Sequence, residues 1–243
     1  MTALLSFEDV ARRFGDVTAL DGVSLGVQRG EIFGLLGPSG SGKTTLLRLA
    51  GILDAPTAGR VLLDGRPVDA GGDRDLATRR RIAMILQKPV VFRGTVLRNA
   101  TYGLRLRDVE EEEARRRAME ALEGVGLGGL AGRSASTLSG GEVQRLAFAR
   151  AAVLRPDLML LDEFTANLDP ANILLLEKAV RGFREAGGTV VMVTHNLPQG
   201  RRLADRVGLL LNGRLVEQAP SLKFFESPET AEAKDFLSGA MVW

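Results

Sequence analysis

The sequence predicts an α/β fold built on a largely parallel sheet, and three observations lead to this fold class. Four short apolar runs are typical of buried strands. Helix-favouring segments separate these runs, which is the order that parallel sheets require. Each run also ends in polar residues, and ligands bind at that edge of such sheets. The four runs are residues 32–36, 82–86, 158–161 and 189–193.

The amino-terminal part has a different pattern, which predicts an antiparallel β-rich subdomain. Apolar residues alternate with polar or small ones over 23–28, so one face of a strand is covered there. We expect the subdomain to comprise residues 4–36 together with 60–70. Phe14 belongs to this part and is one of few aromatic residues; taken alone, it is typical of a hairpin core.

The composition excludes several classes of site. The chain has 243 residues, 45% of them hydrophobic, so a substantial core is available. It has no cysteine and one histidine, which excludes disulfides, thiolate metal sites and multi-histidine sites. The net charge of +2 argues against a general nucleic-acid binder. No linker or change in composition divides the chain, so we expect a single domain, residues 1–243.

The sequence has no segment typical of membrane insertion or secretion. No apolar run approaches the ~18 residues that a membrane span needs. The first nine residues lack the basic start and long apolar core of a signal peptide. We therefore expect a cytosolic protein that works at a membrane, if at all, through a partner.

The segment Gly37–Thr44 matches the phosphate-binding pattern G-x-x-x-x-G-K-[ST] at every fixed position. It follows the strand at 32–36 and precedes a helix-favouring run. Its glycines let the backbone turn and expose N–H groups to an anion, and the helix start adds the positive end of a dipole. Lys43 can reach the outer phosphates, and the Thr44 hydroxyl can bind Mg²⁺. A plain turn rich in glycine and serine is the alternative, but the flanking elements favour phosphate binding.

A helical region is expected between the second and third of the four strands. Glutamates at 110–113 precede arginines at 115–117, which suits an exposed helix with ion pairs four residues apart. The glycine-rich stretch from 124 to 132 is expected to be irregular. A helix should then run from about Ser139 to Leu154, because Pro156 lies just beyond its end.

The carboxyl-terminal part continues the alternation of helices and strands. A helix is expected from about Pro170 to Ala186. Asn212-Gly213 lies between two apolar runs and predicts a hairpin with strands at 207–211 and 214–217. Short helices should follow from residue 221.

Chemically capable side chains follow each of the four strands. The phosphate loop follows the first, Gln87 the second, Asp162 and Glu163 the third, and His195 the fourth. Each signal alone is compatible with an ordinary turn or loop. Because the carboxyl ends of parallel strands meet at one edge of the sheet, we expect all four groups to face one nucleotide.

The expected roles follow from the charge of each group. Asp162 can hold Mg²⁺, directly or through water, as the acidic partner of Thr44. Glu163 can polarise the attacking water. Gln87 can reach the metal or that water as a neutral ligand, and His195 can donate a hydrogen bond to the γ-phosphate.

The stretch Ser139–Glu142 has two readings. Ser-x-x-Glu before a helix is a capping box, which explains Ser139 and Glu142 without a ligand. It does not explain Gly140 and Gly141, because each glycine in a first turn costs about 1 kcal/mol relative to alanine. Bare N–H groups at a helix start suit a second phosphate site, which is the reading we favour.

These motifs, in this order, resemble those of the nucleotide-binding subunit of ABC transporters, and the resemblance covers essentially the whole chain. The matching segments are the Walker A motif Gly37–Thr44, the Q-loop Gln87, the signature Leu138–Glu142, the Walker B motif Leu158–Asp162 with Glu163 after it, the D-loop Asn167–Asp169, and the switch histidine His195.

The resemblance also implies the functional residues. The catalytic residues would be Glu163, His195 and Lys43, and the metal-binding residues Thr44, Gln87 and Asp162. The nucleotide-binding residues would be Phe14, Gly37, Pro38, Ser39, Gly40, Ser41, Gly42, Lys43, Thr44 and Thr45, which reverses the interpretation of Phe14 as hairpin core. Contacts with the partner subunit would come from the signature residues Ser139, Gly140, Gly141 and Glu142 and the D-loop residues Asn167, Leu168 and Asp169.

The fold and partners implied are those of the family. The fold would be a P-loop NTPase core with the amino-terminal antiparallel β-subdomain and a helical subdomain, residues 88–155, that carries the signature. Two copies would form a head-to-tail homodimer that binds two ATP with Mg²⁺. They would drive transmembrane permease subunits, docked on the surface around 88–106 at the inner face of the cell membrane. A solute-binding protein would be an indirect partner, and nucleic acid would not be one.

Two residues depart from the family pattern. The signature usually ends in glutamine, where this chain has Glu142, so an acid would lie close to the γ-phosphate. The D-loop commonly has a small residue where Asn167 lies.

A separate chain of this kind resembles the ATP-binding subunit of a prokaryotic importer. Residues 197–205 and 224–230 are similar to those of oxyanion importers for tungstate, molybdate or phosphate. The alternative is a soluble ABC-type ATPase that acts on nucleic acid or ribosomes, but the coiled-coil insertions or second cassette of that class do not occur here. A small-molecule kinase would have no use for the Ser139–Gly141 stretch.

Overall fold

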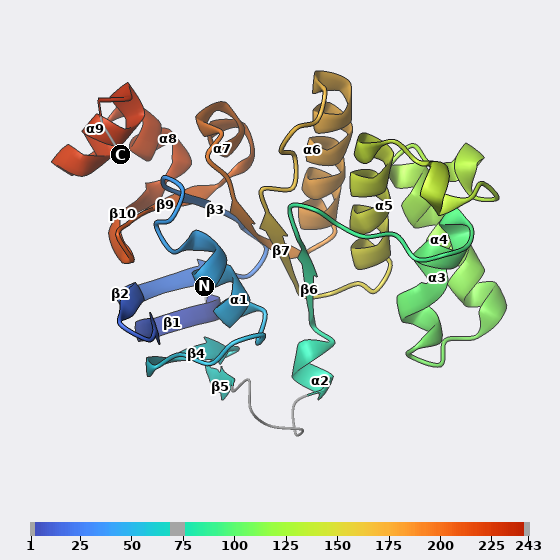
Figure 1. Cartoon of the computed structure of the whole chain (residues 1–243), viewed down its shortest axis with the longest axis horizontal. Coiled ribbons are helices and arrows are strands. Elements are labelled where there is room, and N and C mark those ends of the chain that lie inside the picture. Colours follow the sequence, from blue (N-terminus) through green and yellow to red (C-terminus); the bar gives the residue numbers. More distant parts are fainter. Residues whose placement is uncertain (1–2, 69–75, 241–243) are drawn as a thin grey trace.

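The computed structural model describes residues 3–68 and 76–240, and its helices and strands alternate along the chain (Figure 1). The strands are β1 (Ala3–Phe14), β2 (Val17–Gln28), β3 (Ile32–Leu36), β4 (Ala58–Leu63), β5 (Arg66–Val68), β6 (Ile82–Ile85), β7 (Leu158–Asp162), β8 (Thr189–Val193), β9 (Arg206–Leu211) and β10 (Arg214–Pro220). The helices are α1 (Lys43–Ala50), α2 (Leu76–Arg79), α3 (Val96–Arg105), α4 (Glu111–Gly124), α5 (Gly140–Ala152), α6 (Pro170–Glu185), α7 (Leu197–Leu203), α8 (Ser221–Glu226) and α9 (Ala231–Ser238).

The strands form two sheets. One has the order β2-β1-β4-β5 and is antiparallel throughout. The other has the order β10-β9-β3-β8-β7-β6, in which the five strands from β9 to β6 are parallel and β10 is an antiparallel edge. This confirms the predicted α/β fold with its amino-terminal antiparallel sheet and largely parallel core.

Strand β3 belongs to the six-stranded sheet, so the expected β-rich segment 4–36 does not lie within one sheet. Its side chains are buried on both faces, which a strand at the centre of a covered parallel sheet requires. Ile32 and Leu36 pack into one apolar cluster, and Phe33 and Leu35 pack into the other. The last two residues of the expected 60–70 segment lie outside the described part of the chain.

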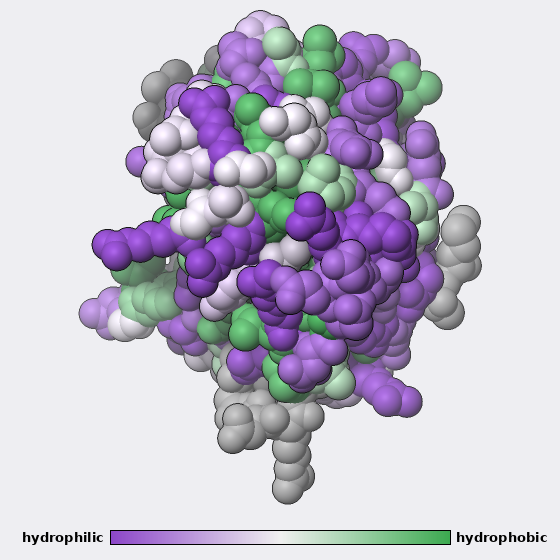
Figure 2. Space-filling model, turned by 90° about the vertical axis from the view of Figure 1, so that its right-hand side faces the viewer, coloured by the Kyte–Doolittle hydropathy of each residue, from purple (hydrophilic) through white to green (hydrophobic). Residues whose placement is uncertain are grey.

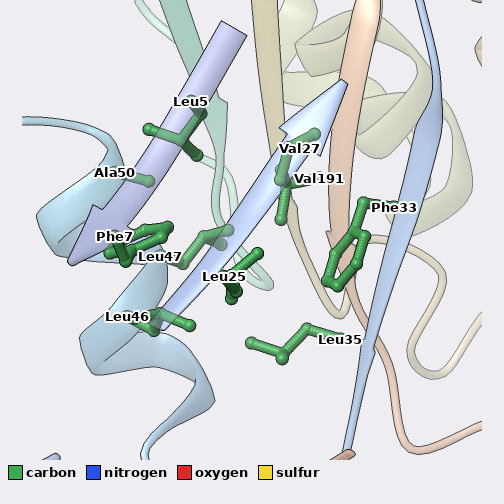
Figure 3. Close-up of a pocket in the computed structure, with 10 residues that line it drawn as sticks. All are labelled: Leu5, Phe7, Leu25, Val27, Phe33, Leu35, Leu46, Leu47, Ala50 and Val191. Atoms are coloured by element: carbon green, nitrogen blue, oxygen red, sulfur yellow. The ribbon is translucent and has the colours of Figure 1, made fainter. Parts of the chain in front are cut away.

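One of the two apolar clusters fills the space between the antiparallel sheet, α1 and the parallel sheet. Figure 3 shows its centre, where Leu5, Leu25, Phe33, Leu47 and Val191 point toward one another. The free space among these side chains is only about 10 Å³. This volume is too small for a ligand, so the seam is packed core that fixes the start of α1 against β3.

Helices α3, α4 and α5 form a separate helical end of the molecule (Figure 1). They pack through small and aliphatic side chains such as Ala100, Ala118, Leu122 and Leu146, all fully buried. Figure 2 looks onto this end, where hydrophilic side chains dominate and apolar side chains gather in patches between them. No helix in the described ranges combines the length and apolarity needed to cross a membrane.

The hairpin predicted at Asn212-Gly213 is present between β9 and β10. Both residues have positive φ, +47° and +77°, as the tightest hairpin turns require. The Gly213 N–H donates to the Ser41 carbonyl oxygen at 3.0 Å, which ties this turn to the phosphate loop. The short helices expected after residue 221 are α8 and α9, and residues 241–243 lie outside the described part.

Candidate nucleotide-binding site

The phosphate loop links β3 to α1, and its backbone depends on glycine. Gly37 has φ +146°, and a Cβ atom there would lie 2.2 Å from the Leu210 carbonyl oxygen. Gly42 has φ +102° and is the N-cap of α1, with no side chain to satisfy the free N–H groups. The loop therefore presents bare backbone donors at a helix start, which is an anion-binding arrangement.

Lys43 is the first residue of α1, and its ammonium group lies over the loop. The Nζ atom donates to the carbonyl oxygens of Gly37 and Pro38, at 2.8 and 2.5 Å, and lies 3.4 Å from Ser41 Oγ. Burial lowers the pKa of Lys43, although the nearby acids Glu163 and Asp162 oppose this effect.

A pocket of about 450 Å³ opens above the loop at the carboxyl ends of the parallel strands. Ten residues line it, and all but Ala19 on β2 were expected from the sequence to bind nucleotide, metal or water. The nine expected residues are Ser39, Gly40, Gly42, Lys43, Thr44, Thr45, Gln87, Asp162 and Glu163. Gly37, Pro38 and Ser41 do not line the pocket but shape the loop from behind. Three of the four groups expected at the strand ends, the phosphate loop, Gln87 and the pair Asp162 and Glu163, thus meet at one polar cavity. The fourth, His195, lines a neighbouring hollow instead.

Thr44 and Asp162 lie together on the floor of the pocket. Thr44 Oγ1 is 3.3 Å from both carboxylate oxygens of Asp162, and Asp162 is only 7% exposed. Burial raises the pKa of Asp162, partly offset by the Thr44 hydrogen bond. A buried carboxylate beside a hydroxyl is an oxygen donor set that suits Mg²⁺.

Glu163 follows Asp162 directly and is held from two sides. Its Oε2 accepts a hydrogen bond from Gln87 Nε2 at 3.0 Å, and its Oε1 lies 3.1 Å from His195 Nδ1. Its φ of +43° is unusual for a residue other than glycine, and such strain is often found at functional sites. The structure therefore brings together the three side chains that the sequence placed after separate strands.

Phe14 ends β1 at the tip of the β1–β2 hairpin and does not line the pocket. It is 48% exposed, so the interpretation as hairpin core is wrong. The Arg12 guanidinium lies 4.5 Å from the ring centroid. The ring is accessible to a flat ligand, which leaves base stacking as a prediction.

The signature stretch starts α5, away from the pocket. Ser139 is the N-cap and forms the predicted capping box with Glu142: Glu142 Oε2 accepts from Ser139 N at 2.7 Å and from Ser139 Oγ at 2.9 Å. Gly140 is exposed, and nothing lies within 4 Å of a Cβ built on it. Gly141 is buried, and its Cβ would lie 2.5 Å from Asn172. Packing within the chain therefore explains Gly141, but not Gly140.

The D-loop residues lie beside a second hollow of about 200 Å³, which Glu163, Asn167, Leu168 and His195 help to line. Asn167 has φ +61°, a conformation that asparagine tolerates better than most residues. Asp169 is instead the N-cap of α6: its Oδ1 accepts from the Asn172 N–H at 3.0 Å.

Two buried side chains support these loops in ways that the sequence did not predict. Arg145 donates to the carbonyl oxygen of Val125 at 2.6 Å and to Asn172 Oδ1 at 2.9 Å, so it connects the helical end to α6. Gln199 lies under the segments that carry Glu163 and His195. Arg145 closely follows the signature stretch, but its bonds to Val125 and Asn172 are not visible in the sequence, and no local motif marks Gln199 as a buried residue.

The comparisons with known proteins agree with this geometry. The family model described as ABC transporter matches residues 20–166. A phosphate import ATP-binding protein of Natronomonas pharaonis is 43% identical, covering 98% of this chain and 88% of its own. A probable anion import ATP-binding protein of Haloferax volcanii is 40% identical with the same coverage. A methionine import ATP-binding protein of Caulobacter vibrioides is also 40% identical, covering 98% of this chain and 73% of its own.

Solved structures extend the agreement to three dimensions. The cbiO1 protein of Clostridium perfringens, part of an ABC transporter complex, has a TM-score of 0.87 at 28% identity, over 97% of this chain and 95% of its own. An ATP-binding cassette captured as a dimer in a post-hydrolysis state with ADP and Pi has a TM-score of 0.80 at 32% identity, over 89% and 98%. The chain therefore belongs to the ABC transporter family and is one of its ATP-binding ATPase subunits.

Proposed function

We propose that two copies of this chain bind two ATP molecules between them and that hydrolysis drives import through a separate membrane permease. The observation that carries the proposal is the polar pocket where the phosphate loop, Gln87, Asp162 and Glu163 converge. The relatives that match over nearly the whole chain are named as import ATP-binding proteins, which supports the importer class over an ATPase of nucleic acid or ribosomes.

Residues in and around the pocket have different roles in binding and hydrolysis. The loop N–H groups and Lys43 bind the phosphates, and Phe14 stacks on the base. Thr44, Gln87 and Asp162 would hold Mg²⁺, which would neutralise phosphate charge. Glu163 accepts the proton of the attacking water, and His195, bonded to Glu163 in this structure, donates to the γ-phosphate.

The partner copy completes the site with its signature stretch. The open space above Gly140 leaves its backbone free to approach a phosphate, and Ser139 is exposed beside it. The D-loop, Asn167–Asp169, lies at the edge of the second hollow and would contact the same partner. The dimeric cassette with ADP and Pi supports an assembly in which two copies share the nucleotides.

A groove beside β6 and α3 is the proposed docking surface for the permease. Its volume is about 420 Å³, and its lining is mostly apolar. Val90 and Leu106 in its lining are 68% and 63% exposed, and the rings of Phe92 and Tyr102 are in contact there, tilted by 39° with centroids 4.5 Å apart. The surface expected around 88–106 thus has the apolar character that a permease helix requires, and docking there would hold the chain at the inner, cytoplasmic face of the membrane.

The proposed cargo is an oxyanion such as phosphate. The phosphate and anion import relatives match this chain over 88% of their own lengths, compared with 73% for the methionine import relative. Methionine is the second candidate, because that relative is 40% identical. Cells that encode the chain would be tested for uptake of radiolabelled phosphate, molybdate and methionine, before and after loss of the gene. Loss of methionine uptake alone would overturn the oxyanion assignment.

Glu163→Gln tests the proposed mechanism. The variant keeps the size of the side chain but cannot accept a proton at neutral pH, so ATP should bind without being hydrolysed. We expect turnover to fall at least a hundredfold and an ATP-dependent dimer to accumulate, as measured by phosphate release and size-exclusion chromatography. Hydrolysis at the parent rate would show that Glu163 is not the general base.

A further inference from the structure

A buried polar network joins the segments that carry Glu163 and His195, and Gln199 lies at its centre. Gln199 is 1% exposed in the first turn of α7. Its Nε2 donates to Thr165 Oγ1 at 2.8 Å, and its Oε1 accepts from Thr194 Oγ1 at 3.0 Å. Thr165 is two residues beyond Glu163, and Thr194 immediately precedes His195. One side chain is therefore bonded to both segments.

The neighbouring hydrogen bonds require an amide at this position. The Asn196 N–H donates to Thr194 Oγ1 at 3.0 Å, which leaves the Thr194 hydroxyl proton for Gln199 Oε1. Gln199 Nε2 also lies 3.5 Å from Glu177 Oε1, a carboxylate that Arg202 holds at 2.7 Å. A glutamate in place of Gln199 would lose the donor and place a second carboxylate beside Glu177.

The two segments need such a connection because they separate beyond the strand ends. The Glu163 N–H donates to the Val193 carbonyl oxygen at 3.0 Å, where β7 and β8 are still neighbours. Further along, the hollow of about 200 Å³ lies between them, with Thr165 and Thr194 both in its lining. Side chains must then set their relative position, and Glu163 itself has a backbone conformation that depends on its surroundings.

We propose that Gln199 is a positioning residue for ATP hydrolysis. By bonding to both segments, it holds the Glu163 carboxylate and the His195 ring in a fixed relative position. The inference rests on the proposed roles of Glu163 and His195. Gln199 does not line the nucleotide pocket, so it acts on the chemical step and not on nucleotide affinity.

The experiment compares kcat with nucleotide affinity in Gln199→Leu, Gln199→Glu and the double variant Glu177→Gln/Gln199→Glu. Both single variants should lower kcat at least tenfold while the Kd for ATP changes less than about twofold. The double variant should recover most of the loss of Gln199→Glu, because it again pairs one amide with one carboxylate and lets both threonine hydroxyls donate to residue 199. Equal kcat in Gln199→Glu and the double variant would overturn the proposal, as would parallel loss of kcat and affinity.

Val180→Ala is the matched control for stability. Val180 is fully buried on α6 one turn beyond Glu177 and is not part of the network. This variant should lower Tm without lowering kcat at temperatures where it is folded. If it lowers kcat as much as Gln199→Leu does at equal loss of Tm, the effect is one of stability and the proposal is wrong.

Glu163→Gln in the same assay distinguishes an error in the role of Glu163 from an error in the role of Gln199. If that variant hydrolyses ATP normally, the proposed general base is wrong whatever Gln199 does. If it is inactive while Gln199→Leu keeps the parent kcat, the general base stands and the positioning role fails.

Discussion

Gly37 has a backbone conformation that a larger residue cannot adopt in its surroundings. Its φ is +146°, and a Cβ would lie 2.2 Å from the Leu210 carbonyl oxygen. We predict that Gly37→Ala lowers the free energy of unfolding by about 3 kcal/mol, measured by urea denaturation. Gly40→Ala is the control from the same loop, with φ +80° but nothing within 4 Å, and should cost only about 1 kcal/mol. Equal costs would contradict a steric origin.

Glu142 adds a negative charge beside the proposed partner phosphate. The Ser139 N–H and hydroxyl lower the pKa of Glu142, so it is ionised at neutral pH. Glutamine also completes a capping box, so Glu142→Gln should change Tm little. With the repulsion removed, the ATP-dependent dimer should form at about tenfold lower protein concentration, measured in the Glu163→Gln background by light scattering. An unchanged dimer Kd would show that the charge lies too far from the phosphates to matter.

The roles of some residues can be predicted from the sequence, and those of others cannot. The phosphate loop is predictable because all its parts lie within eight residues and each has a chemical reason. Gly141 is not, because its constraint is Asn172, which lies 31 positions further along and reaches it only in the folded chain. Gln199 is not predictable either, because nothing local separates a buried glutamine from an exposed one.

The last helix, α9, is anchored by one buried acid of β10. Glu217 is 7% exposed and accepts hydrogen bonds from Glu229 N at 3.1 Å and from Thr230 N at 2.9 Å. We predict that Glu217→Gln lowers the free energy of unfolding at pH 7 by about 2 kcal/mol, measured by urea denaturation. Glu226→Gln, at an exposed ion pair with Arg201, is the control and should cost less than about 1 kcal/mol.

The effect of Glu217 should depend on pH. Burial alone would raise its pKa, but the hydrogen bonds from Thr230 and Glu229 together lower it below the ordinary value of 4.5. Because the pKa of Glu217 is lower in the folded chain than in the unfolded chain, the stabilisation is complete above the unfolded pKa. It is lost as the pH falls through the folded pKa. The difference between parent and Glu217→Gln should therefore shrink below about pH 4. A constant difference down to pH 3 would contradict this.

Secondary structure was predictable where the residues of one element are enough to identify it. The parallel strands and the helix after Ser139 are confirmed because apolar runs, caps and prolines mark them locally. Helix α3 was not predicted as a separate helix within the expected helical region. Its sequence mixes glycine, threonine and asparagine, and Asn99 is buried through bonds to the Phe92 backbone that the sequence does not show.

At the scale of the whole molecule, strand order is the part that the sequence could not supply. Consecutive strands β2 and β3 belong to different sheets, and β3 lies between β8 and β9 from the far end of the chain. The phosphate loop is thus enclosed by elements more than 150 residues away, such as the β9–β10 turn that bonds Ser41. Convergence of the strand ends was nevertheless predictable, because it needs only parallel strands and not their order.

A single copy has half of each proposed ATP site, so the strongest test of the whole assembly lies at Ser139. Ser139→Arg places a long cation where the partner's γ-phosphate would bind, while Ser139→Ala removes the same helix cap, at about 1 kcal/mol, without adding bulk. Both variants should bind ATP as single copies with the parent affinity, because Ser139 does not line their own pocket. In the Glu163→Gln background, only Ser139→Arg should abolish the ATP-dependent dimer seen by light scattering. If the arginine variant still dimerises, the two copies do not meet through the signature stretch.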